Sequence, residues 1–427
     1  MKVLRSWIAG ALVALAAPVL AQESRPAEVG VGIFTFLSGP AAAYGMPGRN
    51  AAELMIERIN AAGGVKGIRL KPVFVDEAQG GAGVVSEFRR LAADETNLVM
   101  VAALSSANCL ALAPVAEQLK MPMLSWNCDT HQLFLKDKYK YVYRTNSSTI
   151  PEFLAYALYL LEKKPDVRRV AIINPDYAFG HDAAEIFKAS LKAFKPDIEI
   201  VAELFPKLGT PTFNTEISRM VAARPDVIFS NLWGADLENF VRQALPRGLF
   251  NTSQVVLALG ETILQRVELP DGVVVGVLGD GWWLSPTSQA NPATKEFVKA
   301  YRDRYGEFPV FPSFKMANSI IALEKVMDKA LGGGGRPSRE GVVAALEGLD
   351  IQTYTGTLRL RPDHDGLVDQ IVGVTRKTDA HPFPIIADMV RYPADKVTPA
   401  PGTEPIGWIG RLSREFLQGV PKPGSYK

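Results

Sequence analysis

The sequence contains few of the residues from which metal sites and disulfide scaffolds are built. Its 427 residues include only two cysteines and four histidines. Two cysteines are too few for a cysteine-rich metal centre or a dense disulfide framework. The charge is also balanced, with 47 Lys and Arg against 45 Asp and Glu. A nucleic-acid-binding surface requires a basic surplus or stripe, so we expect no nucleic-acid partner.

Beyond residue 21 the sequence has no apolar run long enough to cross a membrane, which takes ~20 residues. Residues 1–21 have the three parts of a secretory signal: basic Lys2 and Arg5, the apolar stretch Trp7–Leu20, and a small-residue cleavage site ending at Ala21. Cleavage there would leave 45 basic and 45 acidic residues. We therefore predict a soluble protein that is exported to an oxidising compartment.

The sequence leaves open whether Cys109 and Cys128 are bonded to each other in an oxidising compartment. They could form a disulfide, which would contribute roughly 3 kcal/mol to stability for so short a loop. They could equally remain two separate buried thiols. The distance between the sulfur atoms decides between these outcomes, and the sequence does not contain it.

Sequence motifs of catalysis and cofactor binding are also missing. The chain has no GxSxG, HExxH, P-loop or CxxC motif. Gly30 and Gly32 lack the third glycine of a dinucleotide-binding fingerprint and lie inside a predicted strand rather than at its end. The acidic, His-containing stretch at residues 363–366 is interpreted as a polar turn rather than a metal cluster. We therefore predict a protein that is not an enzyme and uses no metal or cofactor.

From Val29 onward, short apolar runs alternate with stretches whose apolar residues recur at helical spacing. One series occupies residues 29–126 and a second occupies residues 150–259. Strands that alternate with helices form parallel sheets covered on both faces. We therefore predict an α/β fold with two doubly wound parallel-sheet lobes and a ligand site at the carboxyl ends of the strands. Eight prolines in residues 381–427 predict an extended, surface-wrapping tail rather than a third core.

Six short motifs follow one another in a distinctive order along this pattern. They are Ser38-Gly39-Pro40-x-x-x-Tyr44-Gly45, residues 59–67 (INAAGGVKG), Val75-Asp76, Ser105-Ser106, residues 176–180 (DYAFG) and Gly260-Glu261. In order and spacing the chain resembles the leucine/isoleucine/valine-binding family of periplasmic solute-binding proteins, which serve ABC importers. The resemblance covers roughly residues 28–378, so the proline-rich tail departs from it.

The resemblance implies a type I periplasmic-binding-protein fold, in which three chain crossings form a hinge between two lobes. We expect the crossings near Arg144, Gly279 and Tyr354. The expected parts of the chain are an N-terminal lobe of residues 28–143 plus 280–353, a C-terminal lobe of residues 146–278 plus 355–380, and the tail.

Ser105 and Ser106 are the first candidates for ligand binding. They lie between a strand end and a helix start, where hydroxyls, free backbone N–H groups and the helix dipole together form a seat for a carboxylate. The alternative role is an ordinary serine cap for the helix that follows. Ser105 and Ser106 stand at a ligand-binding position of the family that the chain resembles, and this favours ligand binding over the capping role.

The next strand of the same lobe ends at Asn127, Cys128 and Asp129, which are also candidate ligand-binding residues. In related proteins this segment offers a carbonyl and a hydroxyl to an amino-acid ligand, and Asp129 stands where a Thr is usual. An anionic Asp beside a bound carboxylate would repel it by ~1 kcal/mol or more. Three explanations remain open: Asp129 points away, Thr130 takes its role, or the ligand is not a simple aliphatic amino acid.

Glu261 matches the family acid that receives the ligand's ammonium group from the opposite lobe, although it could instead be a solvated helix cap. We place Tyr44, Phe179 and Trp233 in loops after strands rather than on periodic helix faces, so we expect them to face the cleft rather than the core. Further wall candidates are Trp126, Trp282 and Trp283.

The resemblance implies that the protein resides in the periplasm, captures a small amino acid or a related, including aromatic, carboxylate and delivers it to an ABC permease in the inner membrane. We expect it to act as a monomer. A second class of function is a ligand-sensing module for a chemoreceptor or histidine kinase. A third class, an enzyme on a periplasmic α/β fold, is disfavoured because no nucleophile–base motif is present.

Overall fold

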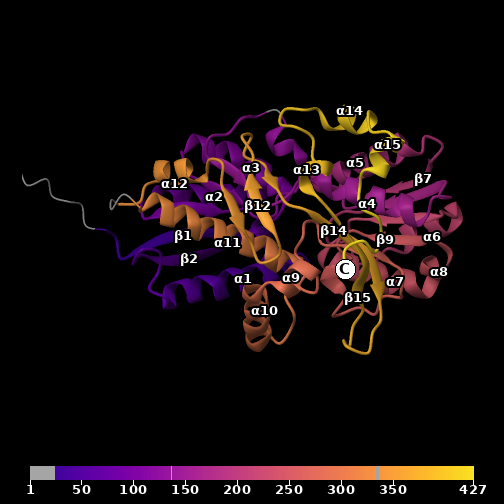
Figure 1. The fold of residues 1–427 in the computed structure, drawn as a ribbon, viewed down its shortest axis with the longest axis horizontal. Helices are drawn as coiled ribbons and strands as arrows, with labels where there is room; N and C mark the ends of the chain where they lie inside the picture. The colour runs from indigo at the N-terminus through magenta and orange to yellow at the C-terminus, as the bar shows by residue number, and fades with distance from the viewer. Residues whose placement is uncertain (1–24, 136, 333–335) are drawn as a thin grey trace, which may run out of the picture.

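The computed structural model describes residues 25–135, 137–332 and 336–427, and the predicted secretory signal lies outside these residues. Two lobes lie side by side along the long axis of the molecule (Figure 1). The first combines indigo, purple and orange segments, and the second combines magenta and yellow segments, so both are built from stretches far apart in sequence. Within the described ranges, no helix is long and apolar enough to cross a membrane.

The first lobe is built on a five-stranded parallel sheet with strand order β2-β1-β3-β4-β5. The strands are apolar and largely buried because helices cover both faces of the sheet. They are β1 (Glu28–Thr35), β2 (Arg69–Asp76), β3 (Asn97–Val101), β4 (Met123–Ser125) and β5 (Val142–Arg144). The connecting helices are α1 (Ala42–Ala61), α2 (Gly80–Ala93) and α3 (Ser106–Gln118).

The second lobe is built on a seven-stranded sheet with strand order β15-β14-β10-β9-β8-β6-β7. Its five parallel strands are β6 (Arg169–Ile173), β7 (Glu199–Leu204), β8 (Val227–Ser230), β9 (Gln254–Leu257) and β10 (Val274–Gly276). Its helices are α4 (Thr149–Lys163), α5 (Ala178–Phe194), α6 (Asn214–Ala223), α7 (Gly234–Ala244) and α8 (Leu249–Thr252). The prediction of two doubly wound α/β lobes is confirmed.

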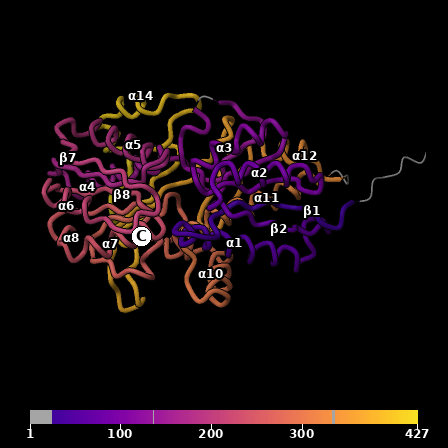
Figure 2. Tube along the Cα trace, turned by 180° about the vertical axis from the view of Figure 1, so that it is seen from behind, coloured from indigo at the N-terminus to yellow at the C-terminus, as the bar shows by residue number. Residues whose placement is uncertain are grey.

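After β10 the chain returns to the first lobe, where the orange helices lie beside the indigo segment (Figures 1 and 2). These helices are α9 (Pro286–Ala290), α10 (Pro292–Tyr305), α11 (Phe311–Ala330) and α12 (Arg339–Leu346). Helix α11 packs along α1, and α12 contacts β3. Arg304 of α10 forms an ion pair with Glu57 of α1. The chain therefore crosses between the lobes more than once.

The last crossing comes later in the chain than we expected. Strands β11 (Asp350–Gln352), β12 (Thr357–Leu360) and β13 (Gly366–Leu367) form a separate small antiparallel sheet. Tyr354 lies in the turn between β11 and β12, and the chain joins the seven-stranded sheet only at Gln370, where β14 (Gln370–Arg376) begins. Strands of two to four residues are too short to leave a clear alternating pattern in the sequence.

The tail also differs from the expected extended segment. Residues Ile385–Tyr392 form β15, which pairs antiparallel with β14 at the edge of the sheet. Proline is tolerated at the ends of an edge strand, and Pro384 and Pro393 flank this one. The short helices α13 (Ala394–Val397), α14 (Pro405–Gly410) and α15 (Arg414–Gln418) then run over the second lobe. The tail therefore wraps the surface only after it has completed the sheet.

Cys109 and Cys128 form a disulfide with a Cα–Cα distance of 5.9 Å. The bond joins the first turn of α3 to the segment that follows β4, and both residues are fully buried. Of the two outcomes that the sequence leaves open, the structure shows the bridge.

We expect the double substitution C109S/C128S to lower the free energy of unfolding by about 3 kcal/mol, because a crosslink across a loop of this length restricts the unfolded chain. The sulfurs are 19 residues apart in sequence. Urea unfolding of the oxidised wild type and the double variant measures the difference. Dithiothreitol should shift only the wild type, and equal midpoints for the two proteins would contradict the prediction.

Candidate ligand-binding site

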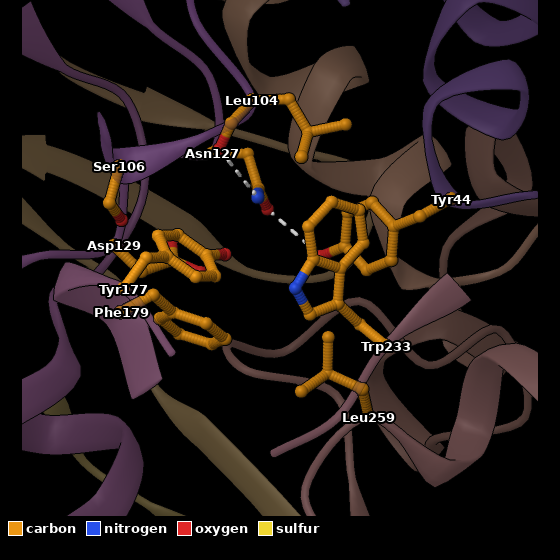
Figure 3. Close-up of a pocket in the computed structure, with 9 residues that line it drawn as sticks. All are labelled: Tyr44, Leu104, Ser106, Asn127, Asp129, Tyr177, Phe179, Trp233 and Leu259. Carbon is orange, nitrogen blue, oxygen red and sulfur yellow. Dashed lines mark hydrogen bonds between the residues drawn. The ribbon is translucent and has the colours of Figure 1, made fainter. Parts of the chain in front are cut away.

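A small cavity lies between the two lobes. Its lining comes from both of them (Figure 3): Tyr44, Leu104, Ser106, Asn127 and Asp129 from the first lobe, and Tyr177, Phe179, Trp233 and Leu259 from the second. Sites for small molecules are concave and mostly apolar with a few polar groups, and this lining has that composition.

The lining residues occupy equivalent places in the two sheets. Leu104 and Ser106 follow β3, while Asn127 and Asp129 follow β4. In the second lobe the lining residues follow β6, β8 and β9. The carboxyl ends of parallel strands in both lobes therefore face the same space, which is where α/β sheets hold their ligands. The sequence predicted this placement.

Aromatic rings form the apolar walls of the cavity. We predicted loop positions for Tyr44 and Phe179, but these residues lie in the first turns of α1 and α5. The Tyr44 hydroxyl donates a hydrogen bond to Asn127 Oδ1 at 3.0 Å, and Asn127 Nδ2 donates to the carbonyl of Leu104 at 3.2 Å. Burial raises the pKa of Tyr44 well above its usual range, so the phenol stays neutral. Its ring lies 5.6 Å from that of Trp233, edge to face, so the two lobes touch here.

Trp233 carries an indole N–H group without a well-aligned acceptor. The side chain is buried, and the Tyr177 hydroxyl interacts with this N–H, but no described residue accepts it in good hydrogen-bond geometry. Figure 3 shows the indole nitrogen facing the space between the rings. A buried donor without an acceptor costs about 1–3 kcal/mol, and a ligand oxygen in the cavity would remove that cost.

Ser105 and Ser106 have different roles in the structure. Ser106 lines the cavity, begins α3, and accepts a hydrogen bond from the Thr130 N–H at 3.3 Å. The first N–H groups of a helix have no intrahelical acceptor, so this end of α3 can face a ligand anion. Ser105 is not among the lining residues, and its N–H donates to a carboxylate of the protein itself, Glu77 Oε2, at 3.1 Å.

Glu77 therefore occupies part of the predicted carboxylate seat. Its Oε1 accepts from the Leu104 N–H at 2.6 Å, and its Oε2 also accepts from Asn108 Nδ2 at 2.9 Å. Burial raises the pKa of Glu77 to about 7. We did not predict this role, and the only sequence signal for it is that Glu77 directly follows β2. The N–H groups that remain for a ligand lie further along, in the first turn of α3.

Asp129 lines the cavity and forms an ion pair with Lys315 of α11. The Lys315 ammonium lies 2.8 Å from Asp129 Oδ1 and 3.2 Å from Glu152 Oε1, and all three side chains are buried. Burial raises the pKa of Glu152 to about 8, and the neighbouring Asp129 charge adds to the rise. Burial also raises the pKa of Asp129, and Lys315 counteracts the rise, so a single ammonium group faces two buried carboxyl groups.

This arrangement bears on the three explanations left open for Asp129. Asp129 does not point away from the cavity, and Lys315 balances its charge. Thr130 is engaged elsewhere, because its hydroxyl donates to Asp182 of α5. His131, Asp182 and Glu185 lie close enough together to surround a cation. Hydroxyl groups of Thr130 and Thr149 already bond Asp182 and His131, however, so we assign no ligand role to this group.

The structure places Cys128 and Glu261 outside the lining of the cavity. Cys128 is held in the disulfide, within the apolar cluster behind β4. Glu261 is buried and its Oε2 accepts a hydrogen bond from the backbone N–H of Phe311 at 3.0 Å. Phe311 is the first residue of α11, so a carboxyl group of the second lobe caps a helix of the first. Trp126, Trp282 and Trp283 do not line the cavity either.

Burial raises the pKa of Glu261 from 4.5 to about 8, so the folded state binds this proton more tightly than the unfolded state. Its contribution to stability is fully present below pH 4.5 and is lost as the pH rises towards 8, by about 1.4 kcal/mol per pH unit for one proton. We expect Glu261→Gln, which cannot ionise, to lose less stability than the wild type between pH 5.5 and pH 8.5.

Urea unfolding at these two pH values measures the difference, and the exposed Glu95→Gln provides the control. Glu77 and Glu152 keep their own pH dependence in both proteins, so the comparison isolates Glu261. Parallel stability–pH curves for the wild type and Glu261→Gln would contradict the prediction.

Comparison with known proteins identifies the family. A family profile described as "Periplasmic binding protein" matches residues 28–378. The Leu/Ile/Val-binding protein homolog 3 of Brucella melitensis is 26% identical over 349 residues, which cover 81% of this chain and 90% of that protein. The Leu/Ile/Val/Thr-binding protein of Salmonella typhimurium is 27% identical over 334 residues, covering 78% and 86%. The chain belongs to the periplasmic binding proteins, and the predicted leucine/isoleucine/valine-binding family is confirmed.

Solved structures share the fold. An ABC-transporter solute-binding protein from Rhodopseudomonas palustris BisB5, in complex with 3,4-dihydroxybenzoic acid, has a TM-score of 0.74 at 22% identity, covering 88% of this chain and 99% of that one. A branched-chain amino acid binding protein from Streptococcus pneumoniae, in complex with isoleucine, has a TM-score of 0.71 at 21% identity, covering 85% and 99%. The predicted type I periplasmic-binding-protein fold is confirmed. Proteins of this family are exported, bind small molecules without catalysis and work with ABC permeases.

Proposed function

We propose that this protein is the periplasmic binding component of an ABC importer and captures a small amino acid or a related, including aromatic, carboxylate. The observation that carries the proposal is the small cavity whose walls come from both lobes. A ligand that touches both walls favours the closed arrangement and shifts the population of lobes towards it. An inner-membrane permease would then recognise the closed shape of the monomer.

The chemistry of the lining supports a ligand with a small apolar or aromatic body and a polar head. Tyr44, Tyr177, Phe179 and Trp233 provide ring faces, while Ser106 and the start of α3 provide donors for a carboxylate. The relatives named above are described as binding branched-chain amino acids, and one structural neighbour holds an aromatic acid. Export would follow from cleavage near Ala21.

A thermal-shift screen tests the proposal. The protein is first unfolded and refolded to remove any ligand carried through purification, then melted with each of the twenty amino acids, benzoate, 4-hydroxybenzoate and 3,4-dihydroxybenzoate. A ligand that binds only the folded state raises the melting temperature. We expect at least one compound to do so and small-angle scattering to show a more compact molecule with it. If none raises the melting temperature, or if the bound compound is chemically converted, the proposal is wrong.

A further inference from the structure

Asp129 is the one charged residue among those that line the cavity. The two other acids near the site serve the protein itself. Glu77 accepts the N–H groups of Leu104 and Ser105, and Glu261 accepts that of Phe311. A donor group on the ligand, such as an ammonium or amide N–H, therefore meets Asp129 rather than Glu261.

Asp129 also has a carboxyl oxygen that can accept a hydrogen bond from such a donor. Lys315 occupies Oδ1 at 2.8 Å, while among the described residues no donor bonds Oδ2. The ion pair holds the Asp129 carboxyl group in place, and Lys315 also contacts Glu152 Oε1 at 3.2 Å. Lys315 is thus paired with carboxyl groups of the protein, so a ligand head with a net negative charge finds no unpaired cation at this ion pair.

The position of Asp129 beside Ser106 indicates which polar groups the ligand carries next to each other. The Thr130 N–H donates to the Ser106 hydroxyl, so the residue after Asp129 contacts the serine that lines the cavity. A hydrogen-bond acceptor and a helix N-terminus thus lie side by side. An N–H group a bond or two from a carboxylate matches both, whereas a carboxylate alone leaves Asp129 without a donor and adds a second negative charge beside it.

We propose that Asp129, positioned by Lys315, accepts the N–H donor of the ligand and makes the site select heads that carry both a carboxylate and a neighbouring N–H donor. This inference rests on the proposed function. It assigns to Asp129 the role that the family resemblance gives to Glu261, and it assigns Glu261 to closure of the lobes.

Isothermal titration with matched pairs tests this selection. The pairs are L-phenylalanine with 3-phenylpropanoate and L-leucine with 4-methylpentanoate, which differ only in the amino group. A charge-assisted hydrogen bond supports a preference of about 30-fold for the amino acid. We expect this preference in the wild type, a preference below about 5-fold in Asp129→Asn, and an unchanged preference in Glu261→Gln.

Equal binding of both members of each pair by the wild type would overturn the inference without any variant, even if Asp129→Asn failed to fold. A preference that survives in Asp129→Asn but disappears in Glu261→Gln would return the role to Glu261 and also overturn it. If the protein binds neither these four compounds nor any compound of the thermal-shift screen, the proposed function fails together with the inference. Binding of carboxylates without an amino group, alone, would refute the inference and leave the proposed function standing.

A second observation concerns the tail and is independent of the cavity. The loop between α10 and α11 in the first lobe rests on the second lobe, where Gln265 bonds both backbone groups of Phe308, at 2.9 and 3.0 Å. The connection between β14 and β15 adds rings to this contact. His381 lies 5.4 Å from Trp283, and Phe383 lies 5.7 Å from Phe308, measured between ring centroids.

These two rings belong to the part of the chain beyond residue 378, where the family match ends. Phe308 follows α10, which is tied to α1 through Arg304 and Glu57, so it moves with the first lobe. His381 and Phe383 sit on a hairpin of the second lobe's sheet. We infer that the hairpin is a latch that stabilises the closed lobes.

Amide hydrogen exchange in the ligand-free protein tests the latch. The N–H groups of Phe308 and Phe311 bond to the opposite lobe, so their exchange reports opening. We expect H381A/F383A to speed exchange at both amides about tenfold. The control is Phe416→Ala, because Phe416 packs on Phe194 within the second lobe. Unchanged exchange in the double variant, or an equal rise in the control, would refute the latch.

Discussion

Lys315→Met is expected to lower the free energy of unfolding by about 3 kcal/mol, because it leaves Asp129 and Glu152 buried without a cation. Lys315 contacts both carboxyl groups and is almost completely buried. Methionine fills a similar volume, so the effect reports charge rather than a cavity. Urea unfolding at pH 7 measures it.

Two further variants make the Lys315 prediction specific. Lys299→Met removes an exposed ammonium that pairs with Asp303 on the surface of α10, and it should change stability far less. Adding Asp129→Asn to Lys315→Met should restore part of the loss, since the remaining buried acid, Glu152, can stay protonated. If Lys315→Met is as stable as Lys299→Met, the buried ion pair does not have the role described here.

Trp233→Ala is expected to weaken binding of L-phenylalanine about 100-fold, because Trp233 forms a wall of the cavity and joins the lobes through Tyr44 and Phe36. Trp233→Phe keeps a ring but removes an N–H donor that lacks a well-aligned acceptor in the protein, so we expect a loss of about 10-fold. Isothermal titration at 25 °C measures both values.

Trp408→Phe is the matched control for the ring substitution, because Trp408 lies on α14 of the tail and does not line the cavity. It should leave the affinity unchanged. Equal affinities for Trp233→Phe and the wild type would show that the indole N–H makes no bond to this ligand. Equal affinities for Trp233→Ala and the wild type would remove Trp233 from the site altogether.

The strand and helix pattern predicted most of the fold because it depends on local spacing. Apolar runs such as Val227–Ser230 are buried on both faces, as central strands of a covered parallel sheet are. The edge strand β15 and the short hairpin of β11 and β12 escaped prediction. Their residues are only partly buried or too few to show a period, and pairing with a neighbour decides whether they become strands.

The same reasoning located part of the candidate site. Ser106, Asn127, Phe179 and Trp233 each follow a strand, and parallel strands that end at one edge of a sheet bring such residues together. Tyr177, one of the lining residues we did not name, follows a strand in the same way. If every residue in the segments that follow strands had been taken as a candidate, Tyr177 would have been among them.

What the sequence by itself determined is therefore the succession of elements and the edge at which their loops meet, because both follow from the period of apolar residues along neighbouring positions. Only the tertiary structure decided which charged group faces which. Lys315 meets Asp129 across 186 positions, and Glu261 turns to the first N–H of α11. Such pairings depend on the distances between elements that are far apart in the sequence and come together only in the folded protein. No local pattern encodes those distances.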